Sequence, residues 1–124
     1  MDLQEMKKTA EHEILHYRES AAFAEGWLDG GGGADAARYR DRMRWVWAVE
    51  RVRTLLKKTN PEKERFFAEL YQLDRPHGRI RPCEAITRLS IEMFLSPSTL
   101  YRWREELLLS VAVAAVQSQA LKPF

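Results

Sequence analysis

The segment Ile86–Glu105, with the sequence ITRLSIEMFLSPSTLYRWRE, has the spacing of two helices joined by a short turn. Apolar residues recur three and four apart, as they do on the inward face of a helix. Ser96 and Pro97 form a helix start signal, because a serine hydroxyl can cap a helix and proline needs no donor at the first position. The segment therefore predicts a DNA-binding helix-turn-helix. The residues expected to face inward are Ile86, Leu89, Ser90, Met93, Leu95, Leu100 and Trp103.

The outward side chains of the second helix are predicted to contact DNA in the major groove. Arginine can form two hydrogen bonds to guanine, and serine or threonine can bond base edges or phosphates. Phe94 occupies the turn, where many such motifs have glycine, so we expect a turn made without a positive-φ residue. A helical hairpin with no role in DNA binding is the alternative. The residues predicted to read bases are Ser98, Thr99, Tyr101 and Arg102.

Basic residues surround the predicted motif. Residues 75–105 carry six Lys or Arg against three Asp or Glu, a balance of +3, whereas residues 1–29 carry three against seven, a balance of −4. Arginines that precede a helix starting at Pro82 would meet free backbone N–H groups there, and both favour phosphate. The acidic first segment is not expected to touch DNA. The predicted phosphate contacts are Arg75, Arg79, Arg81, Arg88, Ser96 and Arg104.

The upstream half predicts an assembly module. Residues 2–28 read as one long helix whose narrow apolar seam repeats every seven residues. The seam must pack on a second helix, from the same chain or from a partner. Gly30–Gly33 forms a joint, and a second long helix over residues 35–58 is apolar on two sides in its first half. We therefore expect residues 1–58 to form a homodimer and residues 59–120 to bind DNA. The predicted dimer contacts are Leu3, Ala10, Ile14, Tyr17, Ala21, Leu28, Met43 and Trp47.

A second chemistry is suggested by His12, Glu13 and His16, which match the H-E-x-x-H pattern of zinc hydrolases. On a helix the two imidazoles would share a face, but a catalytic zinc needs a third rigidly held ligand. No such ligand is evident, and no strand pattern offers an extended substrate a binding edge. We therefore predict no enzyme, metal or cofactor, and keep the zinc hydrolase as a remote alternative.

Length and composition fit one small all-α protein. The chain has 124 residues, of which 45% are hydrophobic and 31% charged. Cys83 is the only cysteine, so it has no partner for an internal disulfide. The apolar stretch from Leu107 to Val116 is shorter than the roughly 20 residues that a membrane helix needs. These features predict a cytoplasmic protein.

Residues 55–115 resemble region 4 of sigma-70-type factors, as it occurs in phage late-gene transcriptional activators of the RinA/ArpU type. The resemblance is carried by EKERFFAELYQLD, EAITRLSIEMF, LSPSTLYRWREELL and VAVAA. It implies an all-α fold in which long N-terminal helices precede a sigma-like helix-turn-helix. It also implies sequence-specific binding at phage or prophage promoters, with contact to RNA polymerase. An interaction protein that binds RNA polymerase with little DNA affinity is the alternative function.

Overall fold

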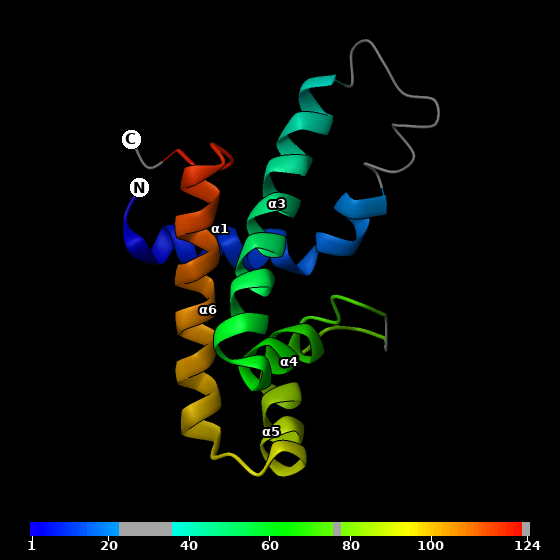
Figure 1. Ribbon diagram of the computed structural model, residues 1–124, viewed down its shortest axis with the longest axis vertical. Coiled ribbons are helices and arrows are strands. Elements are labelled where there is room, and N and C mark those ends of the chain that lie inside the picture. The colour runs from blue at the N-terminus through cyan, green and yellow to red at the C-terminus, as the bar shows by residue number, and fades with distance from the viewer. Residues whose placement is uncertain (23–35, 76–77, 123–124) are drawn as a thin grey trace.

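The computed structural model describes residues 1–22, 36–75 and 78–122, and within these ranges it contains helices and no strand (Figure 1). The prediction of an all-α fold is therefore confirmed. Within these same ranges, no helix combines the length and the apolar character that crossing a bilayer requires. Leu28 and the predicted joint Gly30–Gly33 lie outside the described residues. The helices are α1 (Leu3–Leu15), α3 (Ala36–Thr59), α4 (Pro61–Leu70), α5 (Pro82–Met93) and α6 (Pro97–Gln117).

Helices α3 and α6 lie side by side and form the long axis of the molecule, and α1 crosses behind them (Figure 1). Helices α4 and α5 pack against the N-terminal half of α6. One hydrophobic cluster contains buried residues from α1, α3, α4, α5 and α6. The predicted assembly and DNA-binding parts therefore share a single core.

The helices begin where the local start signals predict. The side chain of Asn60 accepts a hydrogen bond from the Lys63 N–H (3.1 Å), and Pro61 opens α4. Pro82 opens α5 without a side-chain cap. These starts are set by short-range chemistry, which explains why a sequence pattern finds them. Helix α4 ends at Leu70.

The prediction of one unbroken N-terminal helix is wrong. Helix α1 ends at Leu15, His16 leaves the helical conformation, and residues 17–22 are helical again. The break turns the following residues toward α3, where Tyr17 donates a hydrogen bond to Glu50 and Ser20 accepts one from Arg42. These contacts with α3 are the physical reason for the interruption.

The predicted dimer seam is also corrected. Ala10, Ile14 and Tyr17 are buried in the core, because α1 packs against α6 of the same chain. Ala21 and Met43 are half-buried. Leu3 and Trp47 are the members of the predicted set that stay exposed. The part of the predicted set formed by Ala10, Ile14 and Tyr17 is therefore covered by its own chain and cannot contact a second subunit.

The turn between α5 and α6 is made by a residue in the left-handed conformation, contrary to the prediction. Phe94 has φ 58° and ψ 39°, and its N–H donates to the Ser90 carbonyl. Its side chain is 93% exposed, so no packing compensates for the unfavourable backbone of a bulky residue.

Replacing Phe94 with glycine is expected to stabilise the protein by about 1 kcal/mol, because glycine adopts this conformation freely and no buried contact is lost. Phe94→Asn should give a smaller gain, since asparagine tolerates the left-handed region better than phenylalanine does. Urea denaturation followed by circular dichroism measures both. A Phe94→Gly protein less stable than the original would show that the side chain has a contact in solution.

Candidate nucleic-acid interface

Helices α5 and α6 are held together by their inward faces. Ile86, Leu89 and Leu100 are completely buried. Trp103 is half-buried, and its ring meets Phe66 of α4 edge-on at 5.9 Å between centroids. Helix α4 therefore supports α6 from behind and fixes which side chains of α6 face outward.

Three side chains of α6 that were predicted to read bases are exposed together, and we call Ser98, Tyr101 and Arg102 the exposed row. The Arg102 side chain is 68% exposed, and its Nε lies 3.5 Å from a Glu106 carboxylate oxygen. An ion pair this exposed contributes little to stability, so the guanidinium is available to another acceptor. The exposed row thus presents one fork-shaped donor and two hydroxyl groups.

Thr99, the fourth residue predicted to read bases, is less exposed than this row. It is half-buried, and its Oγ1 lies 2.9 Å from the Ser96 Oγ. Ser96 in turn accepts the Thr99 N–H at 3.2 Å and caps α6. Both hydroxyl groups therefore serve the helix start, while Ser96 remains exposed at the surface.

Arg104, a predicted phosphate contact, is instead committed to the interior. Its guanidinium donates to both carboxylate oxygens of Glu11 on α1 at 2.7–2.9 Å, and Tyr71 donates to the same carboxylate at 2.6 Å. Burial opposes the charge, but hydrogen bonds with Glu11 and Tyr71 outweigh it and raise the pKa of Arg104. Burial and the bond to Glu11 also raise the pKa of Tyr71. We call Glu11, Tyr71 and Arg104 the interior cluster.

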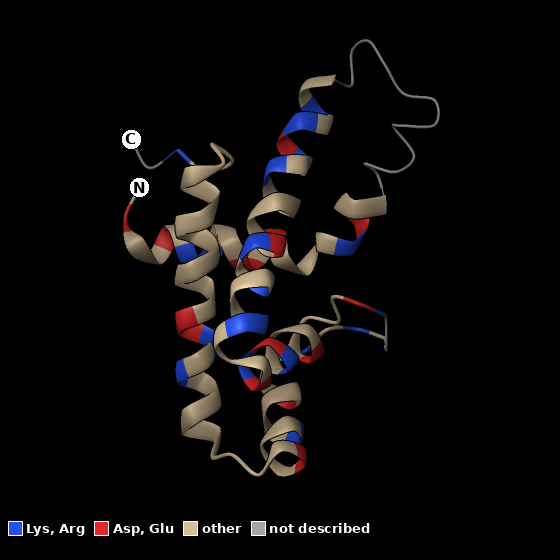
Figure 2. Cartoon of the chain, viewed as in Figure 1, with Lys and Arg blue, Asp and Glu red and all other residues tan. Residues whose placement is uncertain are grey.

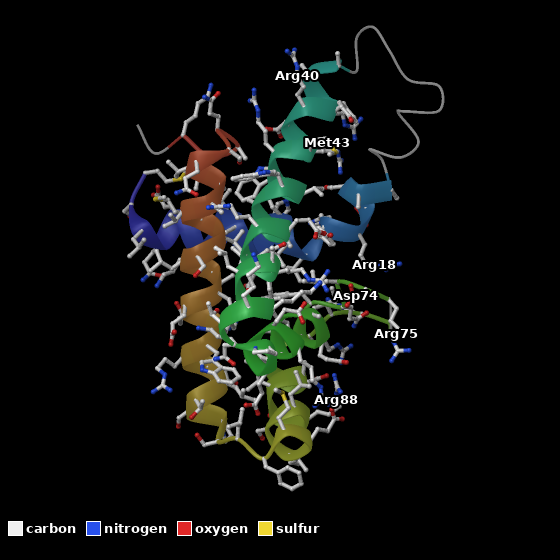
Figure 3. All side chains as sticks on the ribbon, viewed as in Figure 1. Arg18, Arg40, Met43, Asp74, Arg75 and Arg88 are labelled. Atoms are coloured by element: carbon white, nitrogen blue, oxygen red, sulfur yellow. The ribbon has the colours of Figure 1, made fainter. Side chains whose placement is uncertain are left out.

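The other four predicted phosphate-binding arginines line one groove of about 570 Å³ between the end of α4 and the start of α5. Arg75 and Arg88 project from the same side of the molecule (Figure 3). Arg81 lies 3.4 Å from Glu84 and Arg88 lies 3.1 Å from Glu92, but these pairs are exposed and weak. We call this the arginine groove, and its arginines are Arg75, Arg79, Arg81 and Arg88.

The arginine groove and the exposed row adjoin each other at the start of α5. Interaction with the Cys83 side chain raises the pKa of Tyr101, a member of the row. Cys83 is exposed and lies two residues after Arg81. The exposed row of α6 therefore approaches the start of α5, which follows Arg81 of the arginine groove.

The entry to the arginine groove is positioned by an ion pair between the buried Arg53 and the exposed Asp74, which sequence reasoning did not find. Arg53 of α3 is 8% exposed and donates to Glu64 at 3.1 Å and to both oxygens of Asp74 at 2.9 and 3.0 Å. Burial opposes its charge, yet the hydrogen bonds to Asp74 and Glu64 prevail and raise the pKa of Arg53. Because Asp74 directly precedes Arg75, this contact fixes where the groove begins.

Glu69 and Gln72 also line the arginine groove and were not predicted to do so. Gln72 has φ 51°, in the left-handed region, just after α4. A positive φ at glutamine leaves no signal in a sequence, because the residue type does not favour it. Their place at the groove therefore depends on the path of the loop.

The His12 and His16 rings are 4.6 Å apart between centroids, and they line a shallow pocket with Glu13, Arg38 and Asp41. The Nδ1 of His16 lies 2.7 Å from the His12 carbonyl oxygen, so this nitrogen is already engaged. Among the residues that the structure describes, no three His, Cys, Asp or Glu side chains are placed to hold a metal ion.

No family model, no curated protein and no solved structure matches this chain.

Proposed function

We propose that this protein is a sequence-specific DNA-binding transcriptional regulator of phage or prophage type that inserts the start of α6 into the major groove. The observation that supports it most is the joint exposure of Ser98, Tyr101 and Arg102 on α6, on a chain whose four other predicted DNA-binding arginines line one groove. The arginines would bind phosphates and fix the orientation, and the exposed row would contact base edges. The resemblance of residues 55–115 to sigma-like activators supports the same function and adds RNA polymerase as a partner.

The exposed row and the arginine groove have different proposed roles because their chemistry differs. Phosphate contacts carry no sequence information, whereas a guanidinium that forks onto guanine does. Arg79 and Arg81 lie in the arginine groove, and Arg102 lies on the exposed row. The two sets should therefore respond differently to mutation and to salt.

Arg79→Ala and Arg81→Ala are each expected to weaken binding to target and random DNA by the same factor. Each should also lower the slope of log affinity against log salt by about 1, because one fewer counterion is released. Fluorescence polarisation at several salt concentrations measures both quantities. Arg40→Ala is the matched control, because Arg40 is exposed and lies at the opposite end of α3 from α4 and α5 (Figure 3). Loss of target binding alone after either groove mutation would contradict the phosphate assignment.

The proposal itself is tested by selecting bound sequences from a random duplex library and titrating the selected duplex at low and moderate salt. We expect enrichment of one sequence and an affinity that falls steeply as salt rises. Binding that does not depend on salt would contradict docking in the groove. No binding at low salt would favour the alternative, a helical protein that contacts RNA polymerase without DNA.

A further inference from the structure

An exposed apolar face lies along α3 and α6, away from the exposed row. Of the nine large hydrophobic side chains exposed among the described residues, four belong to this face, so it is where uncovered apolar surface is concentrated. A groove of about 420 Å³ runs along it between the two helices. We call it the α3–α6 face, and the four side chains are Trp47, Leu55, Leu109 and Val113.

The α3–α6 face is suited to burial against another protein surface. After Glu106, α6 carries no charged residue, and the corresponding stretch of the ribbon shows none (Figure 2). Ser110 and Gln117 are the polar residues of α6 in the groove. Arg51 of α3 lies 5.7 Å from the Trp47 ring, where the aromatic face stabilises its charge. Arg51 is the charged residue that lines this groove, and the other lining residues are apolar or uncharged, so covering the face buries mainly apolar surface.

We propose that the occupant of the α3–α6 face is a second copy of this chain, packed antiparallel about a two-fold axis that crosses both helices at right angles. The axis passes near Thr54 of α3 and near residue 111 of α6. These positions lie at similar heights, because Leu55 and Leu109 line the same groove. Each helix then meets its own copy, as an isologous interface requires.

Charge complementarity on α3 selects this antiparallel arrangement. Glu50 and Lys58 lie one turn before and one turn after Thr54, and all three line the same shallow pocket with Trp47. Reversing the direction of one helix about Thr54 brings Lys58 of each copy to Glu50 of the other, within reach of Trp47. Two Lys58–Glu50 ion pairs then flank an apolar centre, while Arg51 stays over the Trp47 ring of its own copy. A parallel arrangement would instead bring like charges together.

The spacing of the two exposed rows provides a second reason, which rests on the proposed function. Leu100, the midpoint of the row, lies about three helical turns, or about 16 Å, before residue 111. In the antiparallel dimer the two rows are therefore about 33 Å apart along α6. This matches the separation of about 34 Å between successive major grooves on one side of duplex DNA. Successive residues of a helix are rotated by about 100°, so the exposed row points about a quarter turn away from the α6 residues that line the α3–α6 groove. In the antiparallel dimer the two exposed rows therefore face the same side.

The first test is the mass of the purified protein. The wild-type chain of 14.5 kDa should sediment at equilibrium with twice that mass. Val113→Glu should halve the mass, because two carboxylates would be buried near the axis, while the half-exposed site leaves the monomer fold intact. Leu3→Glu is the matched control, since Leu3 is similarly exposed but lies on α1 outside this face, and it should remain dimeric. A monomeric wild type, or a dimeric Val113→Glu, would overturn the proposal.

Cross-linking tests the same interface without weakening it. In a Cys83→Ser background, Ser110→Cys should be joined to its copy by a short bismaleimide, because residue 110 lies beside the axis. Ser98→Cys in the same background should not react between copies, since it lies three turns away. Cross-linking of Ser98→Cys but not of Ser110→Cys would rule out this arrangement.

Titration with duplex DNA separates this proposal from the proposed function. If the function holds, wild type should prefer two inverted half-sites with centres about 10 base pairs apart, and Val113→Glu should lose about 100-fold of that affinity while keeping its affinity for one half-site. A dimer that binds no DNA would refute the function and leave the interface standing. Tight binding by a monomer would refute the interface and leave the function standing.

Discussion

Replacing Arg102 with alanine is expected to abolish discrimination between target and random DNA. The guanidinium is 68% exposed at the start of α6, and its pairing with Glu106 is weak enough to be exchanged for a base. Loss of a two-pronged contact to guanine costs about 1 to 3 kcal/mol, or about tenfold to a hundredfold in selectivity. The ratio of dissociation constants for the selected and the scrambled duplex measures the effect.

Arg102→Lys serves as the control that separates charge from geometry. Lysine keeps the positive charge, so binding to random DNA should be unchanged, but it lacks the planar fork and should lose most of the selectivity. Arg88→Ala, in the arginine groove, should weaken both duplexes alike. If Arg102→Ala keeps the preference for target DNA, another residue of α6 must read the sequence.

Glu11→Ala is expected to lower the free energy of unfolding by about 2 to 3 kcal/mol. The mutation removes the three hydrogen bonds that hold Arg104 and leaves its half-buried guanidinium without a counterion, and Tyr71 loses its acceptor. Breaking a buried ion pair costs about 3 to 5 kcal/mol, and partial exposure of 22% on each side reduces this figure. The midpoint of thermal unfolding should fall by about 10 °C.

Glu105→Ala is the matched control for this prediction. Glu105 of α6 forms an ion pair at 3.1 Å with Lys7, which lies on α1 as Glu11 does, but the Glu105 side chain is 54% exposed. Such surface pairs contribute less than about 1 kcal/mol, so the thermal midpoint should move little. Equal and small effects of the two mutations would mean that water replaces Glu11 around Arg104.

The sequence predicted those parts of the fold that depend on neighbouring residues. Asn60 with Pro61, and Ser96 with Pro97, place two helix starts, because a cap and its N–H partner lie within three residues of each other. The inward stripe of Ile86 and Leu89 follows from helical periodicity. The exposure of Ser98, Tyr101 and Arg102 then follows by exclusion.

Features that depend on distant partners could not be predicted. An arginine at position 104 has the charge expected of a phosphate contact. Only the fold brings Glu11, which lies 93 residues away in the sequence, within hydrogen-bond distance of it. The same reason applies to Ala10 and Ile14, whose seven-residue repeat fits a second subunit as well as α6. Phe94 was misjudged because residue type favours, but does not fix, a backbone conformation.

The α3–α6 face shows a related limit. Leu55 and Leu109 have the same spacing as the core residues beside them, and periodicity does not say which side of a broad apolar stripe stays uncovered. That distinction requires knowing how far α3 and α6 diverge at the surface. The candidate interface between copies therefore follows from the structure and not from the sequence.

The interior cluster has a consequence for the protein during its synthesis. Helix α1 leaves the ribosome early, but Ala10, Ile14 and Glu11 gain their partners on α6 only after most of the chain has been made. Until then α1 exposes its apolar side, and α6 cannot be held in place before it exists. Contacts between residues this distant in sequence slow folding, because a long loop must close before they form. The hydrogen bonds between Glu11 and Arg104 can therefore form only after residue 104 has been synthesised.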